Sequence, residues 1–252
     1  MKLSIIIPVY NEEKTLDVLY EQISKVPFSV ELEIIYIDDC SIDNSKTIIE
    51  ALAVKDPRVK MIFKDKNEGK GSALSSGIDI ASGDIIVVQD ADLEYDPLEL
   101  PQLIQLILND TADVVYGSRF SAVSSQVVRY GHYLGNKALT VFSNLLSDIR
   151  LTDMETCYKC FKADIVKNMV IESKRFGFEP EVTAKIAKLS VRIHELPISY
   201  NQRSYAEGKK IGVKDGIEAL WLIIKYNLLC NKQSYIKTSM PSKYLGETGI
   251  FK

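Results

Sequence analysis

The chain has 252 residues, of which 46% are apolar and 26% are charged, a balance typical of a soluble globular protein with a sizeable core. Its 31 basic and 34 acidic residues give a formal charge of −3. Nucleic-acid binding requires a basic face, so we expect no nucleic-acid partner.

The first half of the chain alternates apolar strand patterns with helical patterns. Continuous apolar strands separated by helices indicate a mainly parallel sheet with helices on both faces, an α/β fold. The expected strands are Leu3 to Val9, Leu32 to Ile37, Val59 to Phe63, Ile85 to Val88 and Ala112 to Tyr116. The expected helices are 12–26, 44–54, 71–81 and 97–108.

Acidic side chains follow two of these strands. Asp38 and Asp39 follow the second, and Asp90 and Asp92 follow the fourth. Ligands of open α/β sheets bind beyond the carboxyl ends of the strands, so these acids are expected to converge there. Like charges repel unless a cation joins them, and Mg²⁺ takes one or two carboxylates plus substrate phosphates. The Asp-x-Asp pattern therefore fits Mg²⁺ or Mn²⁺ held against a diphosphate, although alone it also fits a solvated turn.

The second half is less regular. Two amphipathic helices are expected at 130–147 and 213–229, with a polar, glycine-containing loop at 200–210 and a poorly ordered polar tail from Asn231. Between them the patterns predict a strand at 158–161, a helix at 180–189 and a short strand at 191–195.

Hydropathy predicts neither a signal peptide nor a membrane span. The start, MKLSIIIPVYNEE, has only a short apolar stretch before acidic residues. The best candidate span, 219–224, is far shorter than the roughly 18 apolar residues required. We expect a cytoplasmic chain, or one peripheral on the cytoplasmic face of a membrane. The lone C-x-x-C pair, Cys157 and Cys160, predicts reduced structural thiols rather than a zinc site.

A set of motifs extends over about residues 4 to 220. They are SIIIPVYNEEKTL (4–16), IIYIDDCSIDNS (34–45), NEGKGSALSSGIDIASGDIIVVQDADLEYDP (67–97), VYGSRF (115–120), LTDMETCYKCFK (151–162), FGFEPEVTAKIAK (176–188) and SYNQRSYAEGKKI (199–211). In this order they resemble the family 2 glycosyltransferases of the GT-A fold, and most closely the dolichol-phosphate mannose and glucose synthases and their bacterial relatives. The resemblance implies one domain over 1–230, with a donor-binding half to about 120 and an acceptor-side half beyond it, before a polar tail at 231–252.

The resemblance assigns the nucleotide to the first two strand ends. It implies that Pro8, Tyr10 and Glu12 contact the base and ribose, and that Ile37 and Asp39 form a second cluster of contacts. Structural alternatives remain open at this point. Pro8 could simply end a strand, and Asp38 or Asp39 could cap the helix after Ser41.

The diphosphate and metal are assigned to the fourth strand end and to an arginine. Asp90, Ala91 and Asp92 match the family's metal and diphosphate motif. Glu94 stands where the mannose synthases usually have Gln, and a carboxylate there would still ligate Mg²⁺ or Mn²⁺, and bind it more tightly. Arg119 matches an arginine that faces the phosphates, a role its planar fork suits, although a surface salt bridge is the alternative. We therefore expect Asp90, Asp92 and Arg119 to be catalytic.

Three further cations are assigned by the resemblance. Arg203 and Lys209 match the loop that closes over the donor, and Arg129 corresponds to a second arginine for the acceptor phosphate. An ordinary solvated basic loop is the alternative for Arg203 and Lys209. By contrast, Gly69-Lys70-Gly71 fits no phosphate-binding fingerprint and is expected to form a tight turn before a helix.

These residues imply a metal-dependent inverting transferase. It would move a hexose, mannose or glucose, from GDP-mannose or UDP-glucose to polyprenyl (dolichyl or undecaprenyl) phosphate. Such a phosphate is already anionic and needs no general base, which suits a chain with no histidine in a motif. Two alternatives stay open: transfer to a saccharide hydroxyl in surface-polysaccharide assembly, which needs a base carboxylate, and a non-catalytic nucleotide-sugar-binding subunit.

A lipid acceptor also requires a membrane surface or a membrane partner protein. The helices at 130–147 and 213–229 could present apolar faces to a bilayer. We nevertheless expect most of their residues to pack on the sheet.

Overall fold

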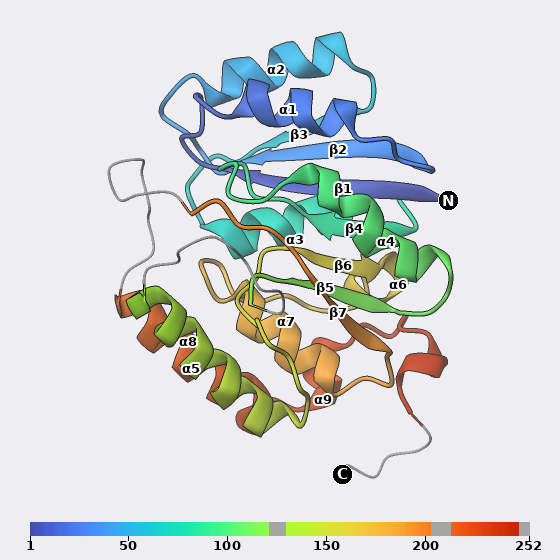
Figure 1. The fold of residues 1–252 in the computed structure, drawn as a ribbon, viewed down its shortest axis with the longest axis vertical. Helices are drawn as coiled ribbons and strands as arrows, with labels where there is room; N and C mark the ends of the chain where they lie inside the picture. Colours follow the sequence, from blue (N-terminus) through green and yellow to red (C-terminus); the bar gives the residue numbers. More distant parts are fainter. Residues whose placement is uncertain (121–129, 203–212, 247–252) are drawn as a thin grey trace.

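The computed structural model describes residues 1–120, 130–202 and 213–246. Its centre is a seven-stranded sheet with the order β3-β2-β1-β4-β6-β5-β7 (Figure 1). β6 is antiparallel to both of its neighbours, and the other four pairs are parallel. The strands are β1 (Lys2–Val9), β2 (Glu31–Asp38), β3 (Val59–Phe63), β4 (Ile85–Val88), β5 (Val114–Ser118), β6 (Lys159–Lys162) and β7 (Ile193–Pro197).

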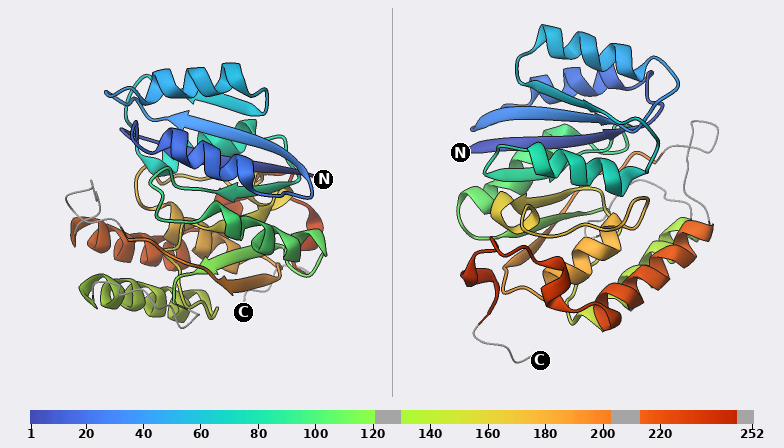
Figure 2. Two further views of the ribbon diagram at one scale, coloured as in Figure 1. Left: turned by 45° about the horizontal axis from the view of Figure 1, so that its top comes forward. Right: turned by 180° about the vertical axis from the view of Figure 1, so that it is seen from behind.

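Helices cover both faces of this sheet, which confirms the predicted α/β architecture. α1 and α4 lie on one face, and α3 and α7 lie on the other (Figures 1 and 2). The described helices are α1 (Leu16–Lys25), α2 (Ser45–Lys55), α3 (Lys70–Ile80), α4 (Leu100–Leu108), α5 (Tyr130–Ser147), α6 (Ala163–Val166), α7 (Phe178–Ala187), α8 (Val213–Ile224) and α9 (Lys232–Tyr235). Three short turns complete them: the 3-10 helices η1 (Pro97–Glu99) and η4 (Ser242–Tyr244), and the π-helical turn η3 (Lys225–Leu229) that continues α8.

The spacing of apolar residues explains where the helices form. Turns before the helices explain part of the difference between their predicted and observed ends. In α1 the buried residues Leu16, Leu19, Tyr20 and Ile23 recur at helical spacing and face the core. The helix was expected to begin at Glu12 but begins at Leu16, because the preceding residues form a turn tied to the loop after β2.

The expectation of a poorly ordered tail is wrong for the described part of it, up to residue 246. Tyr235, Met240 and Tyr244 are buried against the domain. The carbonyl of Tyr235 accepts a hydrogen bond from the backbone of Val170, and that of Tyr244 accepts one from Ser190. Three spaced apolar anchors hold the segment although its composition is polar.

The two amphipathic helices were expected to pack mostly on the sheet, and this expectation is wrong. α7 is buried along almost its whole length, and α5, α8 and η3 pack on α7 and on one another. They form an outer layer beyond α7 (Figure 1). In the described part of the chain no helix has the length and apolarity to cross a membrane.

Candidate active site at the carboxyl edge of the sheet

The loops after β1, β2 and β4 turn sharply at the same edge of the sheet. Each contains one residue in the left-handed region: Asn11 with φ 56°, Cys40 with φ 63° and Leu93 with φ 63°. This conformation costs a residue with a Cβ about 1 kcal/mol or more. The turns keep the polar residues that follow the three strands at the edge, as the sequence predicted.

Pro8, Tyr10 and Glu12 lie partly exposed at this edge. The loop after β1 is tied to the loop after β2 and to the start of α2, since the Asn11 amide donates to Ser41 Oγ at 2.9 Å and the Glu12 amide donates to Ser45 Oγ at 2.9 Å. The predicted nucleotide-binding side chains are thus accessible on a braced backbone.

Ile37 and Asp39 are both buried and contact other parts of the protein, and their assigned contacts with a nucleotide stay predictions. The side chain of Ile37 is fully buried in the core beneath α3 and presents no surface to a ligand. Asp39 is 3% exposed, and its carboxylate accepts hydrogen bonds from the amides of Glu68 at 3.0 Å and Gly69 at 2.6 Å. Asp39 therefore anchors the loop before α3 rather than capping a helix.

That loop requires its glycine. Gly69 has φ +93°, and a Cβ built there would lie 2.6 Å from the carbonyl oxygen of Lys174. The predicted tight turn and helix start at Gly69-Lys70-Gly71 are confirmed. The turn places Lys70 in the first turn of α3, facing the end of β4.

Lys70 joins one of the acids after β4, Asp90, to Glu179 of α7. Its Nζ lies 2.9 Å from Asp90 Oδ1 and 3.0 Å from Glu179 Oε1. Burial by itself lowers the pKa of Lys70, but the two carboxylates raise it well above its ordinary value. Sequence reasoning missed this pairing, because the three residues come from α3, the turn after β4 and α7.

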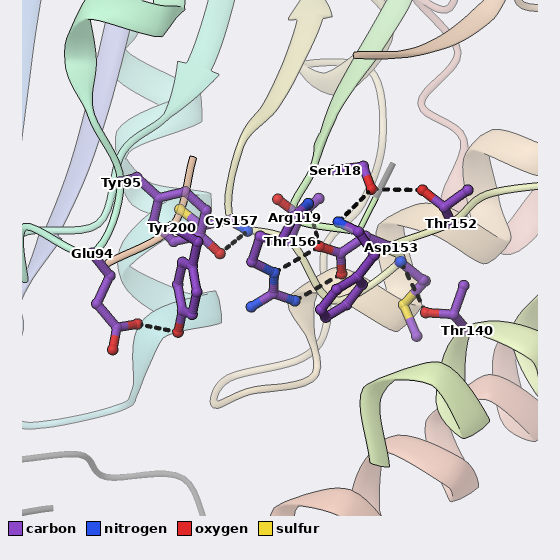
Figure 3. Close-up of polar contacts among 12 residues, drawn as sticks. Glu94, Tyr95, Ser118, Arg119, Thr140, Thr152, Asp153, Thr156, Cys157 and Tyr200 are labelled. Carbon is purple, nitrogen blue, oxygen red and sulfur yellow. Dashed lines mark hydrogen bonds and ion pairs between the residues drawn. The ribbon is translucent and has the colours of Figure 1, made fainter. Parts of the chain in front are cut away.

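Asp92 and Glu94 form the next part of the edge. Asp92 Oδ1 accepts a hydrogen bond from the Glu94 amide at 3.1 Å. The Tyr200 hydroxyl donates to Glu94 Oε2 at 2.6 Å (Figure 3). Ala91 between the two aspartates is buried. Glu94 thereby connects the Asp-x-Asp turn to the segment after β7.

These residues fit a divalent cation only together with a ligand. Over residues 1–120, 130–202 and 213–246, no three His, Cys, Asp or Glu side chains gather closely enough to hold a metal by themselves. Asp90 and Asp92 still supply the hard oxygen atoms that Mg²⁺ and Mn²⁺ prefer, and Mg²⁺ in proteins is commonly held by one or two carboxylates plus substrate phosphates. The donor set therefore fits a cation shared between the protein and a bound diphosphate.

Arg119 is not the surface salt bridge that the sequence left open. Its Nε and Nη2 bind Asp153 Oδ2 and Oδ1 at 2.6 and 2.7 Å (Figure 3), and the two side chains are 8% and 0% exposed. Burial lowers the pKa of the Arg119 guanidinium, but Asp153 raises it well above its ordinary value. The rings of Tyr200 and Phe120 flank the guanidinium at 5.1 and 5.3 Å. Arg119 is thus a fixed, permanent cation.

Asp153 belongs to a tightly held loop, 151–156. The amide of Asp153 donates to Glu195 Oε1 at 3.1 Å, and the buried ammonium of Lys159 donates to the carbonyl of Met154 at 2.9 Å. Burial lowers the pKa of Lys159, although nearby carboxylates oppose this effect. The sequence motif contained these residues, but nothing in it indicated that they position Arg119.

Glu155 in the same loop has a pKa shifted toward neutral pH. Burial, and then the charge of Glu179, raises the pKa of Glu155 to about 7. Its Oε1 is buried and has no hydrogen-bond partner among the described residues. A carboxyl that titrates near neutral pH can take or give a proton during catalysis.

Three predicted site residues lie outside the described residues: Arg129, Arg203 and Lys209. Their assigned contacts with phosphate stay predictions.

Comparison with known proteins identifies relatives. The family model for glycosyl transferase family 2 matches residues 4–169. An undecaprenyl-phosphate mannosyltransferase of Micrococcus luteus is 30% identical over 221 residues, which cover 84% of this chain and 88% of that protein. A dolichol-phosphate mannosyltransferase of Pyrococcus furiosus is 32% identical over 216 residues, which cover 84% of this chain and 60% of that protein.

Solved structures show the same fold at low identity. Glucosyl-3-phosphoglycerate synthase from Mycobacterium tuberculosis, in complex with Mn²⁺, uridine diphosphate and phosphoglyceric acid, matches with a TM-score of 0.67 and 18% identity, covering 91% of this chain and 80% of that chain. S. aureus TarS in complex with UDP matches with a TM-score of 0.62 and 20% identity, covering 93% and 68%. The predicted GT-A fold is thereby confirmed. With the family model spanning well over half of its length, the chain belongs to glycosyl transferase family 2.

Proposed function

We propose that the protein transfers a hexose, mannose or glucose, from GDP-mannose or UDP-glucose to a polyprenyl phosphate, with Mg²⁺ or Mn²⁺ as cofactor and with inversion at the sugar C1. The M. luteus and P. furiosus relatives support the acceptor class by their names. In the protein itself, one arrangement carries the proposal. The buried cation Arg119 and the Asp-x-Asp turn meet in one site, because the ring of Tyr200 lies beside the guanidinium while its hydroxyl binds Glu94 (Figure 3).

In this proposal, one group of residues binds the metal and the donor diphosphate, and another binds the acceptor phosphate. Asp90 and Asp92 would hold the cation, which when bound neutralises charge on the departing nucleoside diphosphate. Arg119 would hold the acceptor phosphate, since a guanidinium fixed by Asp153 needs no reorganisation to bind an oxyanion. The phosphate oxygen then attacks C1 from the face opposite the leaving group. No protein base is required, because the attacking oxygen is already anionic.

Transfer of radiolabel tests the proposal. The protein is incubated with labelled GDP-mannose or UDP-glucose, Mg²⁺ and polyprenyl phosphate, and a chloroform-soluble labelled product is expected. A thermal-shift screen of GDP- and UDP-sugars with Mn²⁺ first identifies the donor, since a ligand that binds only the folded state raises the melting temperature. Absence of label from the lipid phase with every donor would exclude a lipid acceptor.

A saccharide hydroxyl is the second candidate acceptor, and Glu155 is the observation that favours it. A hydroxyl must lose a proton during attack, and a carboxyl with a pKa of about 7 is suited to accept it. Glu155→Gln should then reduce transfer by about 100-fold or more, the usual contribution of a general base. With a phosphate acceptor the same variant should retain transfer close to wild type, so one substitution separates the two acceptors.

A further inference from the structure

Large hydrophobic side chains that are exposed concentrate on one part of the molecule. Among the described residues, nine of eighteen such side chains lie on α5, α8 and η3. Scattered single exposed apolar residues are ordinary, whereas a contiguous group marks an interaction surface. We call this group the outer apolar face: Tyr133, Leu134, Val141, Leu145, Ile217, Leu220, Trp221, Leu228 and Leu229.

Unlike an ordinary surface helix, α5 carries large apolar side chains on its exposed side. Its buried residues include Thr140 and Ser143, whereas Leu134, Val141 and Leu145 are 54%, 48% and 75% exposed. The exposed positions of its described side chains carry no charged residue; they are 131, 133–135, 138, 141 and 145. A helix that meets water on this face would be expected to carry charged or polar residues there.

α8 and η3 extend the same surface. Ile217, Trp221 and Leu228 are 64%, 55% and 62% exposed and recur at helical spacing, while Ile223 and Tyr226 are buried on the opposite side. The exposed charges in the described side chains of α8 are one of each sign, Lys214 and Glu218. The face therefore has no excess of either charge.

The two helices lie side by side. α5 and α8 pack on each other and on α7, and together they form an outer layer of the molecule (Figures 1 and 2). Because their buried sides pack on α7, their apolar stripes face away from the domain. The stripes of the two helices thus contribute to one surface.

This surface is continuous with the proposed acceptor site. The ring of Phe120 packs edge-on against Tyr133 in the first turns of α5, at 5.2 Å between ring centres. The same Phe120 ring lies 5.3 Å from the guanidinium of Arg119. Aromatic side chains therefore connect the arginine proposed to bind the acceptor phosphate with the start of the outer apolar face.

We propose that the outer apolar face seats the protein on a lipid bilayer and so brings Arg119 to the head group of a membrane-embedded acceptor. The proposal rests on the proposed function for its acceptor. An apolar helical face with no net charge and with an exposed tryptophan suits the boundary between head groups and acyl chains. A polyprenyl phosphate has its phosphate at that boundary, so the arginine must reach the membrane surface. A protein partner or a second copy would not require this continuity with Arg119.

Vesicle flotation tests the surface directly. The wild-type protein should float with neutral phosphatidylcholine vesicles, and added salt should weaken binding only slightly, because the face has no net charge. Leu145→Glu and Trp221→Glu should each reduce binding by about tenfold or more, since each removes a large apolar side chain from the membrane boundary. The matched control is Val54→Glu on α2, where the side chain is 89% exposed but distant in the fold, and it should bind as wild type. Unchanged melting temperatures would show that the variants fold.

Two acceptors separate this proposal from the proposed function. Leu145→Glu and Trp221→Glu should lose transfer to a long-chain polyprenyl phosphate in vesicles but retain transfer to a short, water-soluble prenyl phosphate. If the wild type floats but transfers sugar to neither acceptor, the membrane surface stands and the proposed function fails. A wild type that does not float, or variants that float equally well, would overturn the membrane surface. So would a dimer in light scattering that Trp221→Glu converts to a monomer while vesicles remain unbound.

Discussion

The acidic edge after β4 and the 151–156 loop hold their charges in different ways. At the edge, Asp90 is partly exposed, with 21% of its side chain accessible, and its partner is the lysine Lys70. In the loop, Asp153 is fully buried and binds Arg119 through two parallel hydrogen bonds. At the edge, an ammonium on a flexible stem is shared by two carboxylates, Asp90 and Glu179, whereas in the loop a planar guanidinium is held by one carboxylate.

The difference indicates what each region does when ligands arrive. An ammonium on a flexible stem can move away from Asp90 when a metal–diphosphate complex binds. A bidentate guanidinium is already in place and loses little freedom when it binds a further oxyanion. We infer that the donor side of the site rearranges on binding, whereas the acceptor side is organised beforehand.

Removal of Asp153 should have the largest effect. Asp153→Ala leaves the buried guanidinium of Arg119 unpaired, which should lower the free energy of unfolding by about 3–5 kcal/mol. Transfer activity should fall as strongly as in Arg119→Ala, since the arginine loses its orientation. Urea unfolding and kcat/KM for the acceptor measure the two effects.

Asp113→Ala is the matched control for this variant. Asp113 is also buried and ion-paired, with Arg192 and Lys162, but it lies at the opposite end of β5. It should lose stability and keep kcat/KM at a temperature where it remains folded. If Asp153→Ala also kept its activity there, Asp153 would be structural only.

Asp92→Ala tests the other region and should change activity without changing stability. The Asp92 carboxylate accepts a local hydrogen bond from Glu94 and is not part of the core. Transfer should fall by about 100- to 1000-fold, the usual cost of removing a group that stabilises transition-state charge. The melting temperature should stay within a few degrees of wild type.

The control for Asp92 is Asp79→Ala, an exposed aspartate on α3 with a weak ion pair to Lys237. It should transfer sugar as wild type does. Wild-type turnover by Asp92→Ala at the same metal concentration would remove Asp92 from the site.

Substitution of Glu155 should have a smaller effect, on stability, and this effect should depend on pH. Its folded-state pKa of about 7 lies above the ordinary value of 4.5, so the folded state favours the neutral carboxyl. The contribution of Glu155 to the free energy of unfolding is therefore fully present below pH 4.5 and is lost as pH rises through about 7. Glu155→Gln should therefore be about 1–3 kcal/mol more stable than wild type at pH 8, with a much smaller difference at pH 4.5.

Urea unfolding at several pH values measures this difference. Glu50→Gln, at an exposed position of α2, is the control and should differ from wild type by little at any pH. A gain in Glu155→Gln that was equal at pH 4.5 and pH 8 would mean that Glu155 does not titrate in this range.

The two regions also differ in how far the sequence predicted them. Apolar runs followed by acidic residues predicted the strands and the acidic edge, because a short stretch of sequence shows both that a strand is buried and which residues follow its carboxyl end. The ion pairs were missed because each partner lies on a different element: Lys70 is 20 residues from Asp90, and Asp153 is 34 residues from Arg119. The raised pKa of Glu155 depends on burial and on Glu179, which only the packing of α7 brings near.

The polar tail and the outer helices were misjudged for a related reason. Composition averages over a segment, whereas Tyr235 and Tyr244 each fill one buried position in an otherwise polar stretch. For α5, periodicity predicted an amphipathic helix over 130–147 but not the direction in which its apolar side chains face. Tertiary packing decides the direction: it buries Thr140 and leaves Leu145 exposed.

Glu94→Gln should have the smallest effect and would sharpen the comparison at the boundary of the two regions. Its amide oxygen can still accept the hydrogen bond from Tyr200, so the connection to the segment after β7 should survive. One negative charge beside Asp92 is lost, which should weaken Mg²⁺ or Mn²⁺ binding by about tenfold or less. Transfer should match wild type at saturating metal, and a metal titration of the initial rate measures the shift.

Glu99→Gln, which changes a carboxylate that binds Ser199, is the nearby control and should leave the metal titration unchanged. An equal metal requirement in Glu94→Gln and wild type would assign Glu94 to the bond with Tyr200 alone and leave Asp90 and Asp92 as the metal-binding carboxylates.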